Sequence, residues 1–232
     1  MKNRWIAQLG SIGLILTFAV ATHAFEADFD PSTYNPDVAE IVSFEVCETC
    51  LGGSDFTYSW DFDGNGEPEL ETDQDLVTYS FASAGFYEVV LTISDAGGRT
   101  SVARQGIVVG PVPAFAVREL LVESDGTIFV LITIAINEIA PGIGIEEYIP
   151  DGWAVELVDP GGATGRTDME YRRQEYTWMS MFDPGETLTF SYRLRPAYTS
   201  VLPTLHGVVA GFFDSVKGRF VIGMAGMLTL PR

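Results

Sequence analysis

A run of alternating apolar and polar residues that ends in an acidic turn with two glycines constrains the fold most. From Phe56 to Phe62 every second side chain is aromatic, and the chain continues Asp63-Gly-Asn-Gly66. Successive side chains of a β-strand point to opposite faces, so this spacing places one aromatic face against a core. Glycine tolerates the positive φ angles of tight turns. The stretch therefore predicts a half-buried strand followed by a turn.

Similar runs recur along the chain, and none has the period of an amphipathic helix. Apolar alternation returns at 41–46, 76–81 and 86–94, and the turn Asp95-Ala-Gly-Gly98 leads into a return strand at 99–109. Short strands at this spacing, separated by turn residues, are typical of antiparallel sandwiches. We therefore expect an all-β protein made of two Ig-like antiparallel β-sandwiches in tandem.

A proline-containing segment, Gly110-Pro-Val-Pro113, divides the chain into two β-rich halves. Proline fixes φ and donates no backbone hydrogen bond, so this segment predicts a short, stiff linker. Before it we expect an extended leader at 25–37 and a first sandwich at 38–110. After it we expect a second sandwich at 111–232, which includes the apolar run Ile128–Ile136.

The segment 1–24 has the pattern of a secretory signal peptide. Lys2 and Arg4 precede a mainly apolar run, and small residues follow at 21–24. An uncleaved anchor is the competing interpretation, but a spanning helix needs about 20 apolar residues. We expect cleavage near Ala24, or after Ala21, and no stable membrane span in the mature protein. It would then be secreted, held at the cell surface, or kept in a bacterial periplasm.

The overall charge excludes one class of partner. The chain has 32 acidic and 13 basic residues, which gives a net charge of −19 at neutral pH. Nucleic acids need a basic surface, whereas an acidic surface attracts divalent cations. A nucleic-acid partner is therefore excluded, and we expect an extracellular protein or polysaccharide.

Two segments of the first half carry a family resemblance. They are Tyr58-Ser-Trp-Asp-Phe-Asp-Gly-Asn-Gly66 and Thr78-Tyr-Ser-Phe-Ala-Ser-Ala-Gly-Phe-Tyr-Glu-Val-Val-Leu-Thr-Ile-Ser-Asp95. Together they resemble the tryptophan-containing turn and the later strand of PKD domains, with Asn65 where an aspartate is more usual. The resemblance covers residues 38–109. It implies an Ig-like sandwich of a secreted or cell-surface protein, with a binding or spacing role and no chemistry of its own.

The second half is similar to secreted Ig-like repeat domains of the DUF11 kind. The residues concerned are Gly144-Ile-Glu-Glu-Tyr-Ile-Pro-Asp-Gly-Trp153, Trp178 and Asp183-Pro-Gly-Glu-Thr-Leu-Thr-Phe-Ser-Tyr192. This similarity implies another sandwich and nothing catalytic.

The acidic turn offers a candidate calcium site. Oxygen-bearing side chains recur at every second residue, as in a calcium loop: Asp61, Asp63, Asn65, Glu67 and Glu69. Thr72 stands where such a loop has its closing glutamate. The alternative is a solvated acidic loop, with the acids at 67, 69, 71, 73 and 75 lining one face of an extended segment. No cofactor other than calcium is expected.

Cys47 and Cys50 are the only cysteines. A redox role would need a helix N-terminus to lower the thiol pKa, and zinc would need two further ligands. Neither is evident in the sequence, because the pair follows a predicted strand and the nearest histidine of the mature chain, His206, is distant. In an exported chain we expect a local disulfide, which stabilises the fold modestly because its loop is short.

Two adjacent glutamates, Glu146 and Glu147, do not form a convincing catalytic pair. Catalytic carboxylates must flank one bond from opposite sides, whereas neighbouring residues of a strand point to opposite faces of the sheet. We therefore expect these two residues to lie in a turn and not to form a catalytic pair. His206 accompanies no serine motif, which leaves a catalytic triad unsupported.

Aromatic residues of the second half offer a surface for stacking on sugars. Tyr176 and Trp178 are the candidate glycan contacts, with Tyr171 and Tyr198 beside them. Core packing is the competing interpretation, since it accounts for most aromatic residues of sandwiches.

The sequence as a whole predicts a non-enzymatic secreted or cell-surface module for adhesion, scaffolding or protein–protein assembly. Two alternatives stay open. One is a carbohydrate-binding accessory protein, and the other is a hydrolase with an unrecognised carboxylate site.

Overall fold

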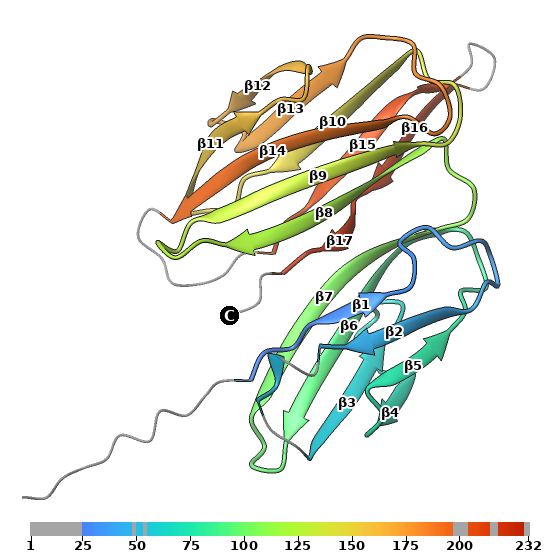
Figure 1. Cartoon of the computed structure of the whole chain (residues 1–232), viewed down its shortest axis with the longest axis vertical. Helices are drawn as coiled ribbons and strands as arrows, with labels where there is room; N and C mark the ends of the chain where they lie inside the picture. The colour runs from blue at the N-terminus through green and yellow to red at the C-terminus, as the bar shows by residue number, and fades with distance from the viewer. Residues whose placement is uncertain (1–24, 48–49, 53–54, 197–203, 214–217, 230–232) are drawn as a thin grey trace, which may run out of the picture.

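The computed structural model describes residues 25–47, 50–52, 55–196, 204–213 and 218–229. The expected signal peptide at 1–24 and the candidate residue Tyr198 lie outside this part of the chain. Every named secondary-structure element of the described residues is a β-strand, so the predicted all-β fold class is confirmed (Figure 1). Among these residues, no helix is long and apolar enough to cross a membrane.

Seven strands form the first sandwich: β1 (Phe29–Pro31), β2 (Val42–Val46), β3 (Phe56–Asp61), β4 (Leu70–Thr72), β5 (Leu76–Tyr79), β6 (Gly85–Asp95) and β7 (Thr100–Val109). One layer is a three-stranded sheet in the order β1–β2–β5. The other layer is the β7–β6–β3–β4 part of a nine-stranded sheet. The predicted turn at residues 95–98 joins β6 to β7, and the Asp95 carboxylate accepts the backbone N–H groups of Gly97 and Arg99.

The aromatic face predicted for β3 lies in the core of this sandwich. Trp60 is 0% exposed, and its ring centroid lies 5.1 Å from that of Phe29 and 5.7 Å from that of Phe62. Each fully buried side chain of this kind stabilises the fold by about 1.5–3 kcal/mol. The alternation in the sequence thus identifies the residues that hold the two layers together.

The segment 25–37 is part of the first sandwich, so the prediction of an extended leader is wrong. Phe25, Ala27 and Phe29 are buried in the core, and β1 pairs with β2. The hydroxyl group of Tyr34 donates a hydrogen bond to Oε1 of Gln105 at 2.8 Å. The segment is ordered because its aromatic side chains cover one edge of the core, which no regular period in the sequence reveals.

The second sandwich contains the remaining strands: β8 (Ala114–Val122), β9 (Ile128–Ile136), β10 (Gly142–Tyr148), β11 (Trp153–Asp159), β12 (Thr164–Asp168), β13 (Arg173–Trp178), β14 (Thr187–Pro196), β15 (Gly207–Phe213), β16 (Gly218–Gly223) and β17 (Ala225–Met227). A five-stranded sheet in the order β12–β13–β10–β15–β16 packs against the β11–β14–β9–β8 part of the nine-stranded sheet. The residues between these layers form a second hydrophobic core, separate from the first.

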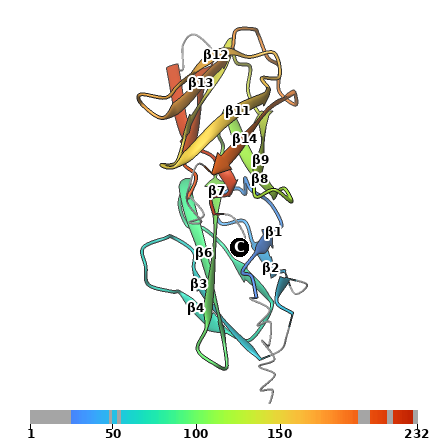
Figure 2. The same cartoon turned by 90° about the vertical axis from the view of Figure 1, so that its left-hand side faces the viewer.

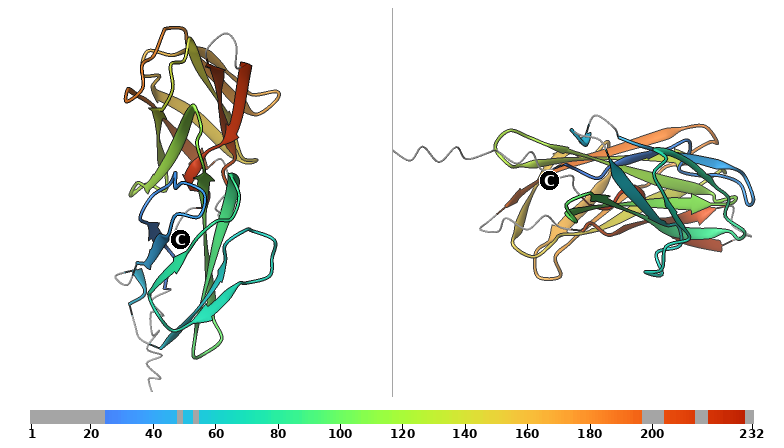
Figure 3. Two further views of the ribbon diagram at one scale, coloured as in Figure 1. Left: turned by 90° about the vertical axis from the view of Figure 1, so that its right-hand side faces the viewer. Right: turned by 90° about the horizontal axis from the view of Figure 1, so that it is seen from below.

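The two sandwiches are stacked end to end and share the nine-stranded sheet (Figures 1 and 2). The last strand, β17, lies between β7 of the first sandwich and β8 of the second, antiparallel to β7 and parallel to β8. The left-hand view of Figure 3 shows the same end-to-end arrangement from the opposite side. A strand from the end of the described chain therefore connects two units that the sequence shows only as separate halves.

Candidate functional site

The carboxylate of Asp61 organises the acidic turn after β3. The residue is 8% exposed, and its Oδ1 accepts hydrogen bonds from the backbone N–H groups of Gly64 at 2.7 Å and Asn65 at 3.2 Å. Its Oδ2 accepts a third from Gly66 at 2.8 Å. Hydrogen bonds from several backbone N–H groups stabilise the charged carboxylate, which can therefore hold the turn together without a bound ion.

Three of the five predicted calcium ligands come together. Asp61, Asp63 and Glu69 each place one carboxylate oxygen within 4.8 Å of the others, a donor set that suits a hard cation in its chemistry. Asn65 and Glu67 are not part of this group, and the Asn65 side chain accepts the backbone N–H of Glu67 instead. Calcium at the turn stays a prediction. The backbone N–H groups that already bind both oxygens of Asp61 favour the alternative, a solvated acidic loop.

The regular ladder of carboxylates expected from Glu67 to Asp75 does not form. Only Glu71 of the ladder lies in a strand, β4, while Pro68 and Gln74 fall in bends or irregular segments on either side. Glu69 turns back, and its Oε2 accepts the backbone N–H of Phe62 at 2.7 Å. The prediction required an extended segment throughout, and the bends on both sides of β4 break it.

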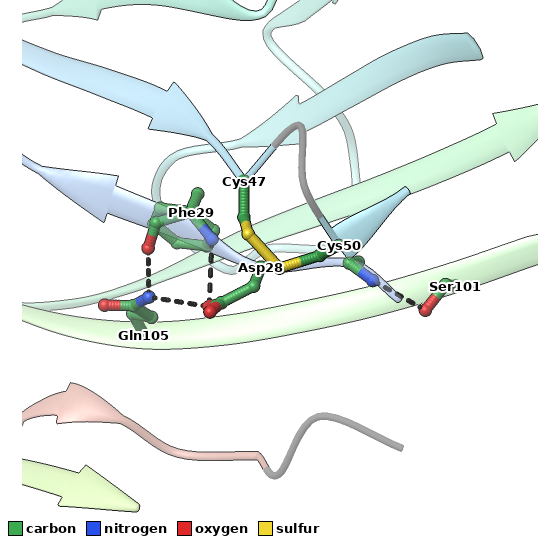
Figure 4. The surroundings of a disulfide bond; sticks show 7 residues. Asp28, Phe29, Cys47, Cys50, Ser101 and Gln105 are labelled. Carbon is green, nitrogen blue, oxygen red and sulfur yellow. Dashed lines mark hydrogen bonds between the residues drawn. A yellow bond between two sulfur atoms is a disulfide. The ribbon is translucent and has the colours of Figure 1, made fainter. Parts of the chain in front are cut away.

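The predicted disulfide between Cys47 and Cys50 is present (Figure 4). The bond closes the short loop after β2, and backbone hydrogen bonds connect this loop to the segment before β1. The N–H of Cys47 donates to the Asp28 carbonyl at 2.9 Å, and the N–H of Glu26 donates to the Cys50 carbonyl at 3.1 Å. Burial raises the pKa of the Asp28 carboxyl group. These backbone hydrogen bonds indicate a structural role for the disulfide at the edge of the first core.

The two candidate glycan contacts are core residues, which corrects their predicted role. Trp178 is 4% exposed and Tyr176 is 7% exposed, and their rings pack beside that of Phe190. The indole N–H of Trp178 donates to the Gly161 carbonyl at 2.8 Å. Neither ring has a free face on which a sugar could stack. Tyr171 is exposed, but these two partners are not beside it at the surface.

Glu146 and Glu147 lie in β10 and not in a turn, and their side chains point to opposite faces of the sheet. Glu146 is half-buried on the outer face and pairs with Arg173 at 3.2 Å. Glu147 is fully buried on the inner face, where Arg118 donates to its Oε1 and the Tyr192 hydroxyl donates to its Oε2 at 3.1 Å. His206 is exposed. The turn prediction is wrong because the Gly142–Tyr148 segment pairs on both sides.

Burial is the largest cause of the raised pKa values of Glu147 and Tyr192. Burial raises the pKa of Glu147, and the Arg118 guanidinium beside it acts in the opposite direction. Burial and the charge of Glu147 together raise the pKa of Tyr192 well above its ordinary value. Arg118 and Glu147 have no exposed surface, so no substrate reaches them, and their geometry is that of a structural ion pair.

Arg118 was missed as an inward-facing residue, although the sequence contains a signal for it. It falls on the same alternate positions of β8 as Ala114 and Ala116, which are buried, and Glu147 falls on those of Ile143 and Ile145 in β10. A basic and an acidic residue, each at a core position of its strand, predict a buried pair, because a lone buried charge is too costly.

An apolar groove of about 340 Å³ crosses the outer face of the five-stranded sheet. Its floor is nearly free of side chains, because Gly142 and Gly144 of β10 lie beside Phe212 and Ala210 of β15 in the sheet register. Polar side chains are few around it, and its other walls are formed by Thr177, Met179 and Arg219. Met179 is 83% exposed and Phe212 is 61% exposed.

Sequence reasoning also missed this groove. The signal is the sequence Gly142-Ile-Gly144, which alternates glycine with a buried isoleucine in a strand. Glycine weakens a strand interior and often marks a place where another group approaches the backbone closely. Glycines on the outward positions of β10 therefore leave a hollow on a sheet face that side chains would otherwise cover.

Solved structures resemble the chain over most of its length, at low sequence identity. A carbohydrate-binding module of the β-sandwich superfamily is 16% identical, with 90% of this chain and 99% of that chain covered and a TM-score of 0.36. A collagen adhesin from S. aureus is 9% identical, with 90% and 95% covered and a TM-score of 0.34. A type II cohesin dyad from the ScaA scaffoldin of Acetivibrio cellulolyticus is 9% identical, with 85% and 93% covered and a TM-score of 0.33. Likenesses of this size carry no information on function.

The family comparison is more specific for the first sandwich. No curated protein matches the chain. The DUF11-type resemblance of the second sandwich stays a prediction. The PKD domain family matches residues 38–106, which include β2 to β6, most of β7, the core residue Trp60 and the Asp61 turn. Residues 38–106 of this chain are accordingly a PKD domain.

Proposed function

We propose that this protein is a non-enzymatic extracellular module for adhesion or assembly, whose second sandwich binds a protein partner. The groove on the five-stranded sheet carries this proposal. Its glycine floor lets a partner's backbone or side chain approach the sheet, and the exposed Met179 and Phe212 flank the place of contact. The PKD domain acts as the spacer that carries this face.

The chemistry of the groove favours a protein over a polysaccharide. Thr177 and Arg219 are the polar side chains among its lining residues. A sugar buries several hydroxyl groups, and each one left without a hydrogen bond costs about 1–3 kcal/mol. Methionine, aromatic residues and arginine are enriched at protein–protein interfaces, and all three types line this groove. A partner segment with apolar side chains therefore fits it best.

The buried carboxylate of the second sandwich supports a role without catalysis. Glu147 is held by Arg118 and Tyr192 inside the core, and Glu146 is held by Arg173 on the opposite face of β10. Carboxyl groups on opposite faces of one sheet cannot act on the same bond. Glu146 and Glu147 of β10 therefore do not form the carboxylate pair that the hydrolase alternative would need.

Photo-crosslinking in the native surroundings tests the proposal and captures a partner whose identity is not yet established. A photo-reactive amino acid replaces Val221, which neighbours the groove residue Ala210 in the sheet register. The control position is Leu76 in the PKD domain, because Val221 and Leu76 are both 55% exposed. We expect a discrete crosslinked protein from position 221 and none from position 76.

A second substitution distinguishes binding in the groove from chance proximity. Phe212→Asp places a charge on the groove wall and should abolish the crosslink from position 221. Leu121→Asp is its matched control, because Leu121 is 62% exposed on β8 and Phe212 is 61% exposed. The proposal is overturned if both positions crosslink the same proteins, or if the crosslink survives Phe212→Asp.

A further inference from the structure

The joint between the sandwiches is formed by a strand only three residues long. In β17, Gly226 lies opposite Gly106 of β7 on one side and opposite Arg118 of β8 on the other. Without β17 the first and second sandwiches would present two separate sheet edges here. The strand therefore closes the nine-stranded sheet across the boundary.

Close backbone approach explains why glycine occupies the centre of β17. Gly226 has a φ of 82°, and a Cβ atom there would lie 2.3 Å from the Arg118 carbonyl oxygen. A Cβ atom at Gly106 would lie 2.7 Å from the Met224 carbonyl oxygen. A side chain larger than hydrogen at position 226 would therefore be both strained and in collision with β8.

The residues around β17 anchor it to both sandwiches. Met224, Ala225 and Leu228 are buried. The N–H of Leu228 donates to the Arg104 carbonyl in the PKD domain at 3.0 Å. The Leu228 carbonyl accepts the N–H of Leu205 in the second sandwich at 2.7 Å. One short segment thus exchanges backbone hydrogen bonds with both units.

The buried ion pair holds the same segment from inside the second core. Nη1 of Arg118 donates to the Met227 carbonyl at 3.3 Å and to the Leu205 carbonyl at 3.5 Å, while its other nitrogens bind Glu147. The guanidinium is therefore fixed by the carboxylate of β10 and presents a donor to β17. This position gives the buried charge pair a structural role at the joint.

A second set of hydrogen bonds holds the linker, and in it the bonds of Asn35 to the backbone are partly buried while those of Asn137 are exposed. The Asn35 side-chain amide donates to the carbonyls of Val108 at 2.7 Å and Gly110 at 3.0 Å, and the Asn137 amide donates to the Val112 carbonyl at 3.1 Å. The two side chains meet at 3.4 Å, and this contact is exposed. Exposed hydrogen bonds compete with water and contribute less than buried ones.

We propose that β17 is a clasp, a short strand that locks the PKD domain and the second sandwich into one rigid body when it is seated. When the clasp leaves its place between β7 and β8, each sandwich keeps its own core and turns about the Gly110–Pro113 linker. The inference goes beyond binding in the groove, because it concerns how the binding face is held and does not require a partner.

Nuclear magnetic resonance relaxation of the mature full chain tests the clasp. We expect one rotational correlation time for the amides of both sandwiches in the native protein. Gly226→Val should split this value into two shorter ones while the amide signals of both cores stay dispersed. Gly126→Val is the matched control, because Gly126 has a φ of 79° with no atom within 4 Å of a built Cβ atom. It imposes similar backbone strain and should leave a single correlation time.

Two further measurements keep the test decisive if Gly226→Val does not fold. Gly226→Ala adds only a methyl group and should give the same split to a smaller extent. In the native protein, the amide of Leu228 should exchange with solvent faster than that of Ile132 in the second core, because the clasp opens without global unfolding. A single correlation time in a folded Gly226→Val variant, or equal exchange at Leu228 and Ile132, overturns the proposal.

Discussion

Breaking the buried pair of Arg118 and Glu147 should be far more harmful than replacing both partners together. Each residue has no exposed side-chain surface, and Glu147 also accepts the Tyr192 hydroxyl. In Glu147→Leu, the Arg118 guanidinium stays buried without its anion. In Arg118→Met, the carboxylate stays buried without its cation. Either charge is left in a medium that solvates it poorly.

The structure sets the expected magnitudes. Removing one partner of a buried pair destabilises a protein by about 3–5 kcal/mol. The double variant Arg118→Met/Glu147→Leu buries no charge, so this penalty disappears. It still removes the donor from the Leu205 and Met227 carbonyls and the acceptor from Tyr192. Each of these three lost hydrogen bonds contributes at most about 1 kcal/mol, so we expect the double variant to be destabilised by about 1–3 kcal/mol.

Urea unfolding followed by tryptophan fluorescence measures these values in the second sandwich. Trp153 and Trp178 lie in its core and Trp60 lies in the first, so a Trp60→Phe background of the protein starting at Phe25 isolates the signal. Arg166→Met, which removes an exposed pair with Glu175, is the control and should change the free energy of unfolding by less than about 1 kcal/mol. A double variant whose deficit equals the sum of those of the two single variants would show that Arg118 and Glu147 do not stabilise each other.

Four other predictions concern the PKD domain. Asp61→Ala leaves three backbone N–H groups without their acceptor and should lower the free energy of unfolding by about 2–3 kcal/mol in urea; an unchanged midpoint would remove the structural role of this carboxylate. Because those amides already satisfy Asp61, we expect equal melting temperatures in EDTA and in calcium, whereas a rise with calcium would establish a bound ion, which must stabilise the folded state. Replacing Cys47 and Cys50 with serine should cost only about 2 kcal/mol, since the loop is short, and a loss of folding would contradict this. The backbone N–H of Arg99 lowers the pKa of the Asp95 carboxyl group below its ordinary 3.8. The contribution of this group to the stability of the fold is therefore present above pH 3.8 and is lost as the pH falls through the lowered pKa. Carbon-detected titration of the side chain checks the direction of the shift.

The fold could be predicted from local patterns because the strands that carry it are regular. Alternation identified the face of β3 that holds Trp60, and the Asp95 turn identified the β6–β7 hairpin. The segment 25–37 was predicted less well, because β1 has only three residues and its place in the core depends on partners far along the chain. A period cannot be read from so short a strand.

The candidate sites depended on the arrangement in space, which a single sequence does not contain. The calcium prediction found Asp61, Asp63 and Glu69 because they are close along the chain. The glycan prediction failed because aromatic residues at a strand surface and in a core have the same spacing, and only the packing of two layers distinguishes them. The groove and β17 arise from pairings between distant segments, such as Gly142 with Phe212 and Gly226 with Gly106.

Oxidative footprinting in the native surroundings tests the central claim, that a protein partner occupies the groove, most directly. Met179 forms a groove wall and is 83% exposed, while Met169 is 49% exposed and does not line the groove. Hydroxyl radicals oxidise exposed methionine to the sulfoxide. We expect Met179 to be protected in the native surroundings relative to the purified protein, while Met169 reacts equally in both. Equal oxidation of Met179 in the two conditions would contradict it.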